Sequence, residues 1–167
     1  MAQKKKILIV DDDISFLETF ALILKEEGFD VFEATTAESG FEALVVSKPD
    51  LVILDKNLPD KSGYEVLASM KKSKDFFSIP VMLITADTAV LVDEAFDKGA
   101  DDCIFKPINQ QETIKRINKL EKIKNLTFLF EKSYKRTIDK IKANNNSSVL
   151  LKDYQKNGLD KLMKYDN

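Results

Sequence analysis

Acidic, hydroxyl and amine side chains stand directly after short apolar runs at four places in the sequence. They are Asp11, Asp12 and Asp13 after residues 7–10, Asp55 after residues 51–54, Thr85 after residues 81–84, and Lys106 after residues 102–105. Carboxylates that lie close together repel one another, and a hard divalent cation such as Mg²⁺, which prefers oxygen ligands, relieves the repulsion. A carboxylate beside such a cation and a lysine can attack phosphorus and form an aspartyl phosphate. The set therefore predicts phosphoryl chemistry if these positions meet in space.

The elements that must position these side chains alternate between two patterns over the first part of the chain. Short, almost wholly apolar runs at residues 7–10, 51–54 and 81–84 are typical of strands buried on both faces of a parallel sheet. Weaker strand signals lie near residues 30–35 and 102–105. Between the runs, apolar residues recur at helical spacing and stop at glycine or proline. This alternation predicts an open α/β sheet with helices on both sides.

Each helical pattern supplies a candidate buried face. The residues are Ile14, Leu17, Ala21 and Leu24 in the first helix, Phe41, Leu44 and Val45 in the second, Val66, Leu67 and Met70 in the third, and Val92, Ala95 and Phe96 in the fourth. Asp13, just before the first helix, is expected to cap it, because aspartate is favoured at that position. In an open parallel sheet, ligands bind outside the carboxyl ends of the strands. We therefore expect the polar side chains to converge at that edge.

The pattern changes after Pro107. Residues 109–143 contain neither proline nor glycine, and apolar residues recur every three or four positions. This predicts either one long helix or two helices with a break near Asn125. Residues 144–148, Asn-Asn-Asn-Ser-Ser, are typical of a linker, and a short amphipathic segment follows. The apolar stripe within residues 114–141 could pair two copies as a short coiled coil, although its spacing departs from a regular heptad.

Composition excludes several kinds of site and sets expectations for others. The chain of 167 residues has no histidine and a single cysteine, which excludes Ser-His and Cys-His catalysis, histidine-ligated zinc and an internal disulfide. Residues 1–110 carry 12 basic and 21 acidic side chains, whereas residues 111–167 carry 14 basic and 7 acidic ones. A solvated, lysine-rich helix is the simplest interpretation of the basic part. Because no secretory signal and no apolar run of about 20 residues is visible, we expect a cytoplasmic protein with no membrane association.

Four segments carry a family resemblance. They read I-L-I-V-D-D-D at residues 7–13, D-K-N-L-P-D-K-S-G-Y-E at 55–65, L-I-T-A at 83–86, and G-A-D-D-C-I-F-K-P at 99–107. Together they resemble the CheY-like receiver domain of bacterial two-component response regulators. The resemblance implies a flavodoxin-like, doubly wound, five-stranded parallel sheet in the order 2-1-3-4-5, with helices on both faces. We expect a receiver domain at residues 1–122 and a C-terminal helical extension of unassigned role at residues 123–167.

Carried over position by position, the resemblance assigns roles in phosphoryl transfer. Asp55 would be the phosphoacceptor, Thr85 the switch hydroxyl and Lys106 the lysine that binds the phosphoryl group. The family also implies a cis peptide bond between Lys106 and Pro107.

The same resemblance implies a metal site. Asp11 and Asp12 would form its acidic pair. Asp12 and Asp55 would ligate Mg²⁺ or Mn²⁺, joined by the backbone carbonyl of Asn57.

Four positions bear on how the switch would work. Cys103 stands where receivers usually carry an aromatic residue that moves together with the switch threonine, Thr85. Lys56 occupies a position that is more often apolar in the family. Asn57 and Asp87 lie two residues after the acceptor and the switch threonine, at positions that tune hydrolysis of the aspartyl phosphate in the family.

The implied function is phosphorelay signalling. Asp55 would accept a phosphoryl group from a phosphohistidine on a sensor histidine kinase or a histidine phosphotransfer protein, with Mg²⁺ bound. The face between Thr85 and Lys106 would then change and control a partner. A homodimer could form through the fourth helix and fifth strand or through the C-terminal helix. Only self-directed phosphotransfer and dephosphorylation are expected, and direct DNA binding is not, because residues 123–167 lack the turn pattern of a winged helix.

Two alternatives stay open at this point. A degenerate receiver would act as an interaction module that does not depend on phosphorylation, and Cys103 keeps this alternative in view. A phosphatase-type hydrolase would also use an aspartate nucleophile, but such enzymes place an acid/base aspartate two residues later. Asn57 stands there, which disfavours turnover of an external substrate.

Overall fold

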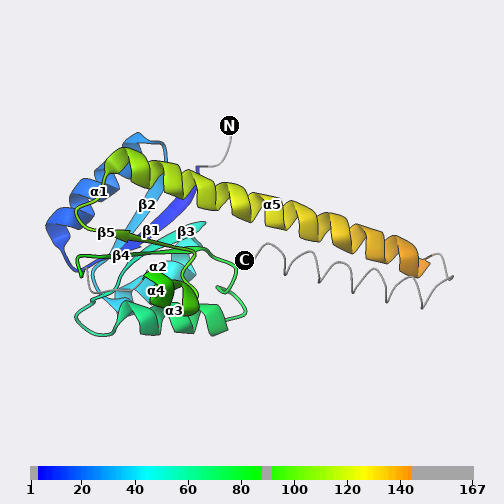
Figure 1. Cartoon of the computed structure of the whole chain (residues 1–167), viewed down its shortest axis with the longest axis horizontal. Coiled ribbons are helices and arrows are strands. Elements are labelled where there is room, and N and C mark those ends of the chain that lie inside the picture. The colour runs from blue at the N-terminus through cyan, green and yellow to red at the C-terminus, as the bar shows by residue number, and fades with distance from the viewer. Residues whose placement is uncertain (1–3, 88–91, 144–167) are drawn as a thin grey trace. The chain divides into compact units, whose positions relative to one another are not determined.

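The computed structural model describes residues 4–87 and 92–143, and within them strands and helices alternate (Figure 1). The elements are β1 (Lys6–Val10), α1 (Ile14–Glu26), β2 (Asp30–Ala34), α2 (Ala37–Ser47), β3 (Leu51–Asp55), α3 (Gly63–Lys72), β4 (Val81–Thr85), α4 (Val92–Asp97), β5 (Asp102–Phe105) and α5 (Gln110–Ala143). Each apolar run that predicts a strand forms one. The expected strand–helix order is therefore confirmed.

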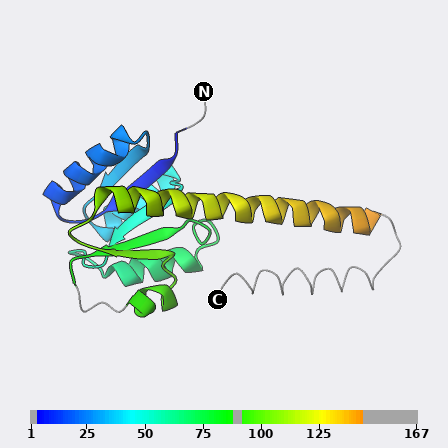
Figure 2. The same ribbon diagram turned by 45° about the horizontal axis from the view of Figure 1, so that its top comes forward.

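The strands form one parallel sheet in the order β2-β1-β3-β4-β5. This is the order that the resemblance implies, and the flavodoxin-like fold class is confirmed. The three central strands are almost wholly apolar because helices cover both faces of the sheet, as Figure 2 shows. The carboxyl ends of all five strands consequently lie along one edge.

Alternate residues of each strand enter separate hydrophobic cores. On β1, Leu8 and Val10 join the core beneath α2, α3 and α4, whereas Ile7 and Ile9 join the core beneath α1 and the first part of α5. The side chains of all four are at most 1% exposed. The sheet is thus held from both sides, which fixes the positions of the residues at its carboxyl edge.

Polar residues fix where the helices begin. Asp13 is the N-cap of α1, as predicted, and its carboxylate accepts a hydrogen bond from the backbone N–H of Phe16 at 3.1 Å. Ser62 caps α3, and its backbone N–H donates a hydrogen bond to the carboxylate of Glu65 at 3.0 Å. Gly28, the predicted stop of α1, has a φ of 93°, a conformation that favours glycine.

Four residues of the predicted helical faces are exposed rather than buried. Ile14 is 60% exposed, Val45 59%, Phe96 45% and Val92 39%. Ile14 and Val92 are the first residues of α1 and α4, and Val45 and Phe96 each follow a residue that points into the core. Successive residues of a helix differ by about 100° in direction, so a neighbour of a buried residue turns away from the core.

The helix α5 is continuous from Gln110 to Ala143, so the single-helix alternative holds and no break occurs near Asn125. At the start of α5, the side-chain oxygen of Asn109 accepts a hydrogen bond from the backbone N–H of Glu112 at 3.0 Å. The chain divides into two units between Glu121 and Lys122, and the first part of α5 belongs to the unit that holds the sheet. The predicted linker at residues 144–148 and the amphipathic segment beyond it lie outside the described residues.

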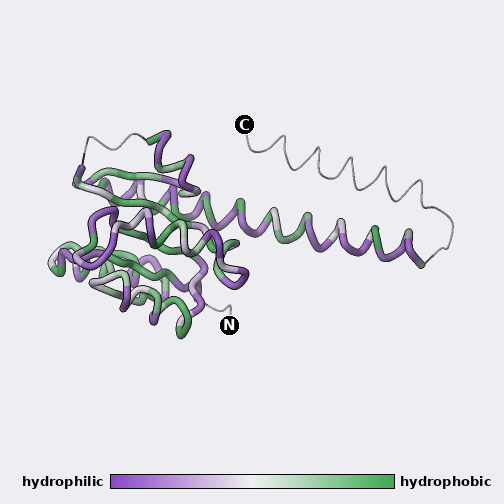
Figure 3. The backbone as a smooth tube through the Cα atoms, turned by 90° about the horizontal axis from the view of Figure 1, so that it is seen from below, coloured by the Kyte–Doolittle hydropathy of each residue, from purple (hydrophilic) through white to green (hydrophobic). Residues whose placement is uncertain are grey.

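The part of α5 in the second unit carries exposed apolar side chains. They are Ile123, Leu126, Phe128, Leu129 and Phe130, each at least 40% exposed. Figure 3 shows hydrophilic and hydrophobic residues alternating along this helix. None of the helices in the described ranges combines the length and apolar composition that a membrane span requires.

Candidate functional site

The sheet register brings the acidic ends of β1 and β3 together. Val10 of β1 pairs with Leu54 of β3. The next residue of each strand is an aspartate, so Asp11 and Asp55 lie side by side at the carboxyl edge. Their side chains are nearly inaccessible, at 0% and 7% exposure. Two carboxylates in such a place require a positive neighbour, because burial disfavours their charge.

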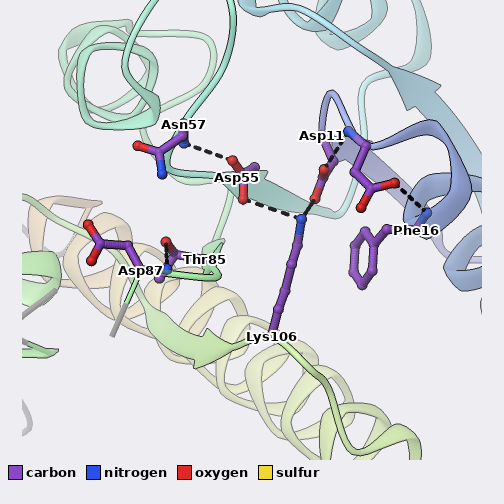
Figure 4. A network of polar contacts seen from close by, with 8 residues as sticks. Asp11, Phe16, Asp55, Asn57, Thr85, Asp87 and Lys106 are labelled. Carbon is purple, nitrogen blue, oxygen red and sulfur yellow. Dashed lines mark hydrogen bonds and ion pairs between the residues drawn. The ribbon is translucent and has the colours of Figure 1, made fainter. Parts of the chain in front are cut away.

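Lys106 supplies that positive charge from the end of β5. Its Nζ lies 2.6 Å from Oδ2 of Asp11 and 3.5 Å from Oδ1 of Asp55, as Figure 4 shows. The ammonium also lies 4.3 Å from the centre of the Phe16 ring, which adds a cation–π contact. The Lys106–Pro107 peptide bond is cis. One ammonium is thus shared between the two buried carboxylates.

The protonation of Asp55 reflects opposing influences. Burial raises the pKa of its carboxyl above the ordinary value of 3.8, and the nearby charge of Asp11 acts in the same direction. The backbone N–H of Asn57, which donates to Oδ2 at 2.8 Å, and the Lys106 ammonium lower that pKa without cancelling the effect of burial. The Asp55 carboxylate is therefore poorly compensated, and an added cation would stabilise its charged form.

The donors at this edge fit a magnesium ion held by few protein ligands. Asp11 and Asp55 offer hard carboxylate oxygens beside one shared cation. Asp12 follows Asp11 but is exposed. Among the described residues, no group of three histidine, cysteine or acidic side chains is gathered tightly enough to hold a metal ion. Mg²⁺ commonly binds through one or two carboxylates and keeps several waters, so Asp11 and Asp55 are a suitable pair.

The predicted switch hydroxyl lies on the neighbouring strand. Thr85 is fully buried at the end of β4, and its Oγ1 accepts a hydrogen bond from the backbone N–H of Asp87 at 3.0 Å. Its strand partner is Phe105, the residue before Lys106. Register alone therefore brings the predicted acceptor, hydroxyl and lysine to the same edge.

Cys103 is buried in β5 at the position where the family usually carries an aromatic residue. Burial raises the pKa of its thiol, and the charge of Asp102 adds to that effect. The thiol is therefore a small buried side chain rather than a reactive one. A groove of about 460 Å³ opens over this strand, between α4 and α5, and its lining includes Val92, Phe96 and Cys103.

Three contacts around the site do not follow from the periodic pattern of the sequence. Lys56 pairs with Asp87 at 2.8 Å, and Phe16 lies beneath the Lys106 ammonium. Asp60 accepts hydrogen bonds from the backbone N–H groups of residues 37 and 38 at 2.8 and 3.0 Å, which lower the pKa of its carboxyl. All three join residues distant in sequence. Only the opposite charges of Lys56 and Asp87, each just after adjacent strands, could have suggested a contact.

A close approach of two backbone segments shapes the loop after Asp55. The backbone N–H of Gly63 donates to the carbonyl of Lys56 at 2.7 Å. A Cβ added at Gly63 would collide with the backbone carbonyl oxygen of Asp55. Glycine is therefore required where α3 begins, because any side chain would push the acceptor loop out of place.

Comparison with known proteins points to one family. Residues 7–118 match the response regulator receiver domain. The cell cycle transcriptional regulator CtrA of Caulobacter vibrioides is 36% identical over 117 residues, which are 68% of this chain and 48% of that protein.

Solved structures agree with the sequence match. The CheY-like response regulator receiver domain protein of Methanospirillum hungatei is 30% identical, with a TM-score of 0.69 over 75% of this chain and 99% of that one. NtrX of Brucella abortus is 28% identical, with a TM-score of 0.74 over 81% of this chain and 30% of that one.

The curated relatives are longer than the matched region. The chain spans about half the length of the transcriptional regulators it matches, so their activity as whole proteins is not carried over. The expectation that this chain does not bind DNA directly thus stays a prediction. Receiver domains are in general signalling modules that interact with histidine kinases or phosphotransfer proteins, and they generally bind Mg²⁺. With its sheet order, its carboxyl-edge site and these matches, the chain belongs to the response regulator receiver family of two-component signal transduction.

Proposed function

We propose that this protein accepts a phosphoryl group on the carboxylate of Asp55 from a phosphohistidine of a partner protein. The observation that supports it most directly is the Lys106 ammonium, which lies within 3.5 Å of Asp55 and 2.6 Å of Asp11. A cation at that place can neutralise a phosphoryl oxygen as well as the acceptor. Positioning and charge neutralisation are most of what phosphoryl transfer requires.

The transfer step balances without a further reactant. An oxygen of the Asp55 carboxylate attacks phosphorus, a P–O bond forms, and the P–N bond to the histidine breaks. The histidine nitrogen keeps the electron pair of the broken bond. Lys106 holds charge on the equatorial oxygens, and the buried Thr85 hydroxyl can donate to one of them. Mg²⁺, held by Asp11 and Asp55 with Asp12 and the Asn57 carbonyl as further candidate ligands, would neutralise the remaining charge.

The added phosphoryl group would bring about 1.5 to 2 negative charges to the carboxyl edge. These charges would draw the Thr85 hydroxyl and the Lys106 ammonium toward Asp55. Because Thr85 and Lys106 lie at the ends of adjacent strands, their movement would reach the groove over β5, between α4 and α5. We propose this face as the output surface, for a protein partner or a second copy of the chain.

Labelling with a small phosphodonor tests the acceptor. The purified protein is incubated with acetyl phosphate and Mg²⁺, and intact mass is measured over time. We expect the mass of a single phosphoryl group on the wild-type protein, loss of the label at alkaline pH, and no label after Asp55→Asn. Asp30→Asn is the matched control, because Asp30 is an exposed aspartate at the start of β2, at the other end of the sheet. Equal labelling of the Asp55→Asn variant would contradict the assignment.

The two alternatives draw no support from the comparisons. A phosphatase-type hydrolase would release phosphate from a phosphoester over many turnovers per protein molecule. A degenerate receiver would fold normally and take no label. The same labelling reactions, followed by phosphate release, separate both from the proposed function.

A further inference from the structure

A chain of contacts beside the site joins the loop after the acceptor to the loop after the switch hydroxyl. Lys56 directly follows Asp55, and its Nζ lies 2.8 Å from Oδ2 of Asp87. The backbone N–H of the same Asp87 donates to Oγ1 of Thr85 at 3.0 Å. Lys56 is therefore connected to the Thr85 hydroxyl through one residue.

Lys56 is held in place through both its backbone and its side chain. Its backbone N–H donates to the carbonyl of Ile84 at 3.0 Å, and its carbonyl accepts from the backbone N–H of Gly63 at 2.7 Å. Its ammonium lies 5.9 Å from the centre of the Tyr64 ring, and its side chain is only 22% exposed. The hydrogen bond to Asp87 raises the pKa of Lys56. A residue fixed at its backbone and its side-chain end can hold a neighbouring loop.

The position of Asp87 limits how far the Thr85 hydroxyl can move. In Figure 4 the carboxylate of Asp87 extends away from Asp55, while its backbone N–H reaches back to the Thr85 hydroxyl. Thr85 is fully buried, so the hydroxyl has little free space. It can shift toward a phosphoryl group on Asp55 only by carrying the Asp87 backbone with it or by losing this hydrogen bond. The first change strains the ion pair with Lys56, and the second gives up a hydrogen bond whose donor that ion pair holds in place.

We propose that Lys56 is a positioning residue that, through Asp87, holds the Thr85 hydroxyl in the observed position and opposes its movement toward a phosphoryl group on Asp55. The inference rests on the proposed function of Asp55. A contact that stabilises one of two arrangements shifts the equilibrium by its own free energy. Partly exposed ion pairs contribute modestly, so loss of this pair should tighten binding of a phosphoryl mimic about two- to five-fold.

Binding of beryllofluoride, a mimic of the aspartyl phosphate, tests the proposal in the full chain. Its dissociation constant with Mg²⁺ is measured by calorimetry for the wild type, Lys56→Met, Asp87→Ala and the double variant. We expect each single substitution to tighten binding about two- to five-fold and the double variant to bind no tighter than either single one. A merely structural role would lower the thermal midpoint and leave binding unchanged or weaker.

Lys98→Met is the matched control. Its ammonium lies 5.1 Å from the same Tyr64 ring, but its ion pair, at 3.8 Å, is with Glu94. The control should bind beryllofluoride as the wild type does. Equal tightening in the control, or unchanged or weaker binding in both single variants, would overturn the proposal. If the wild type neither binds the mimic nor takes the acetyl phosphate label, both the proposed function and this inference are wrong. If the wild type binds the mimic and the single variants bind it with the same dissociation constant, only the inference is wrong.

Discussion

The carboxyl edge of the sheet and the second part of α5, residues 122–143, use charged and apolar residues in opposite ways. At the edge, Asp11 and Asp55 are buried and share the ammonium of Lys106, and the apolar strands behind them are inaccessible. In the second part of α5, apolar side chains such as Leu126 and Phe128 are about 60% exposed. Burial of charged groups at the edge lowers stability unless each charge has a partner of opposite sign. Exposure of apolar side chains on a helix lowers stability little. Buried charges therefore indicate a functional site, whereas an exposed apolar stripe by itself does not.

The largest expected contrast lies between two leucines. Leu54 is fully buried directly before Asp55, and Leu126 is 58% exposed. We expect Leu54→Ala to lower the free energy of unfolding by about 3 kcal/mol, because it leaves a cavity in the core. Leu126→Ala should change it by less than about 0.5 kcal/mol. Denaturant unfolding measures both, and a large loss in the Leu126 variant would show that the stripe is covered in solution.

Gly63→Ala should have the next largest effect. The new methyl group would meet the carbonyl oxygen of Asp55, so the acceptor loop must shift, at a cost of about 2 kcal/mol. Acetyl phosphate labelling should slow as well. Gly28→Ala is the control, because no atom lies within 4 Å of its added Cβ and only its φ of 93° is unfavourable. That variant should lose about 1 kcal/mol and keep normal labelling; equal labelling rates in both variants would contradict the role of Gly63.

Asp55→Asn should stabilise the fold at neutral pH by about 1 kcal/mol, because active-site residues are often kept at the expense of stability. The pKa of Asp55 is raised in the folded protein, chiefly by burial. Its contribution to stability is therefore fully present below the unfolded value of 3.8 and is lost as pH rises through the folded pKa. Thermal unfolding across this pH range should show the difference between variant and wild type shrinking on acidification. Asp139→Asn, at an exposed residue of α5, is the reference variant for the same measurement.

The smallest expected effect concerns Phe16. Phe16→Leu keeps an apolar side chain beneath the Lys106 ammonium but removes the aromatic face 4.3 Å from it. The lost cation–π contact should lower the free energy of unfolding by about 0.5 kcal/mol. A double-mutant cycle with Lys106→Met isolates this term, since the two single effects should not add. Strict additivity would show that the ring only packs against its neighbours.

The sheet and its edge were predictable because they rest on local patterns. Apolar runs that end in a polar residue predict both a buried strand and a side chain at its carboxyl end, so the positions of Asp11, Asp55 and Thr85 follow from sequence. The length of α5 was only partly predictable, because its spacing agrees equally with one helix or with a break at Asn125.

The contacts around the carboxyl edge of the sheet could not be predicted from the sequence in the same way. Lys56 and Asp87 are 31 residues apart, and their pairing depends on how two loops leave adjacent strands. Neither residue interrupts a periodic pattern, and each alone is an ordinary surface residue. The exposure of Val45 has a similar origin, because helical spacing identifies a face only to within one residue.

The hydrogen bonds from the backbone N–H groups of Ala37 and Glu38 to Asp60 also make two natural probes. Amide proton frequencies depend steeply on hydrogen-bond length, and these two amides report on a carboxylate five residues after Asp55. They lie at the start of α2, away from the metal and phosphoryl ligands proposed here. A two-dimensional spectrum of the nitrogen-labelled protein could therefore follow the acceptor loop without any engineered label, through two signals from a helix that takes no part in the chemistry.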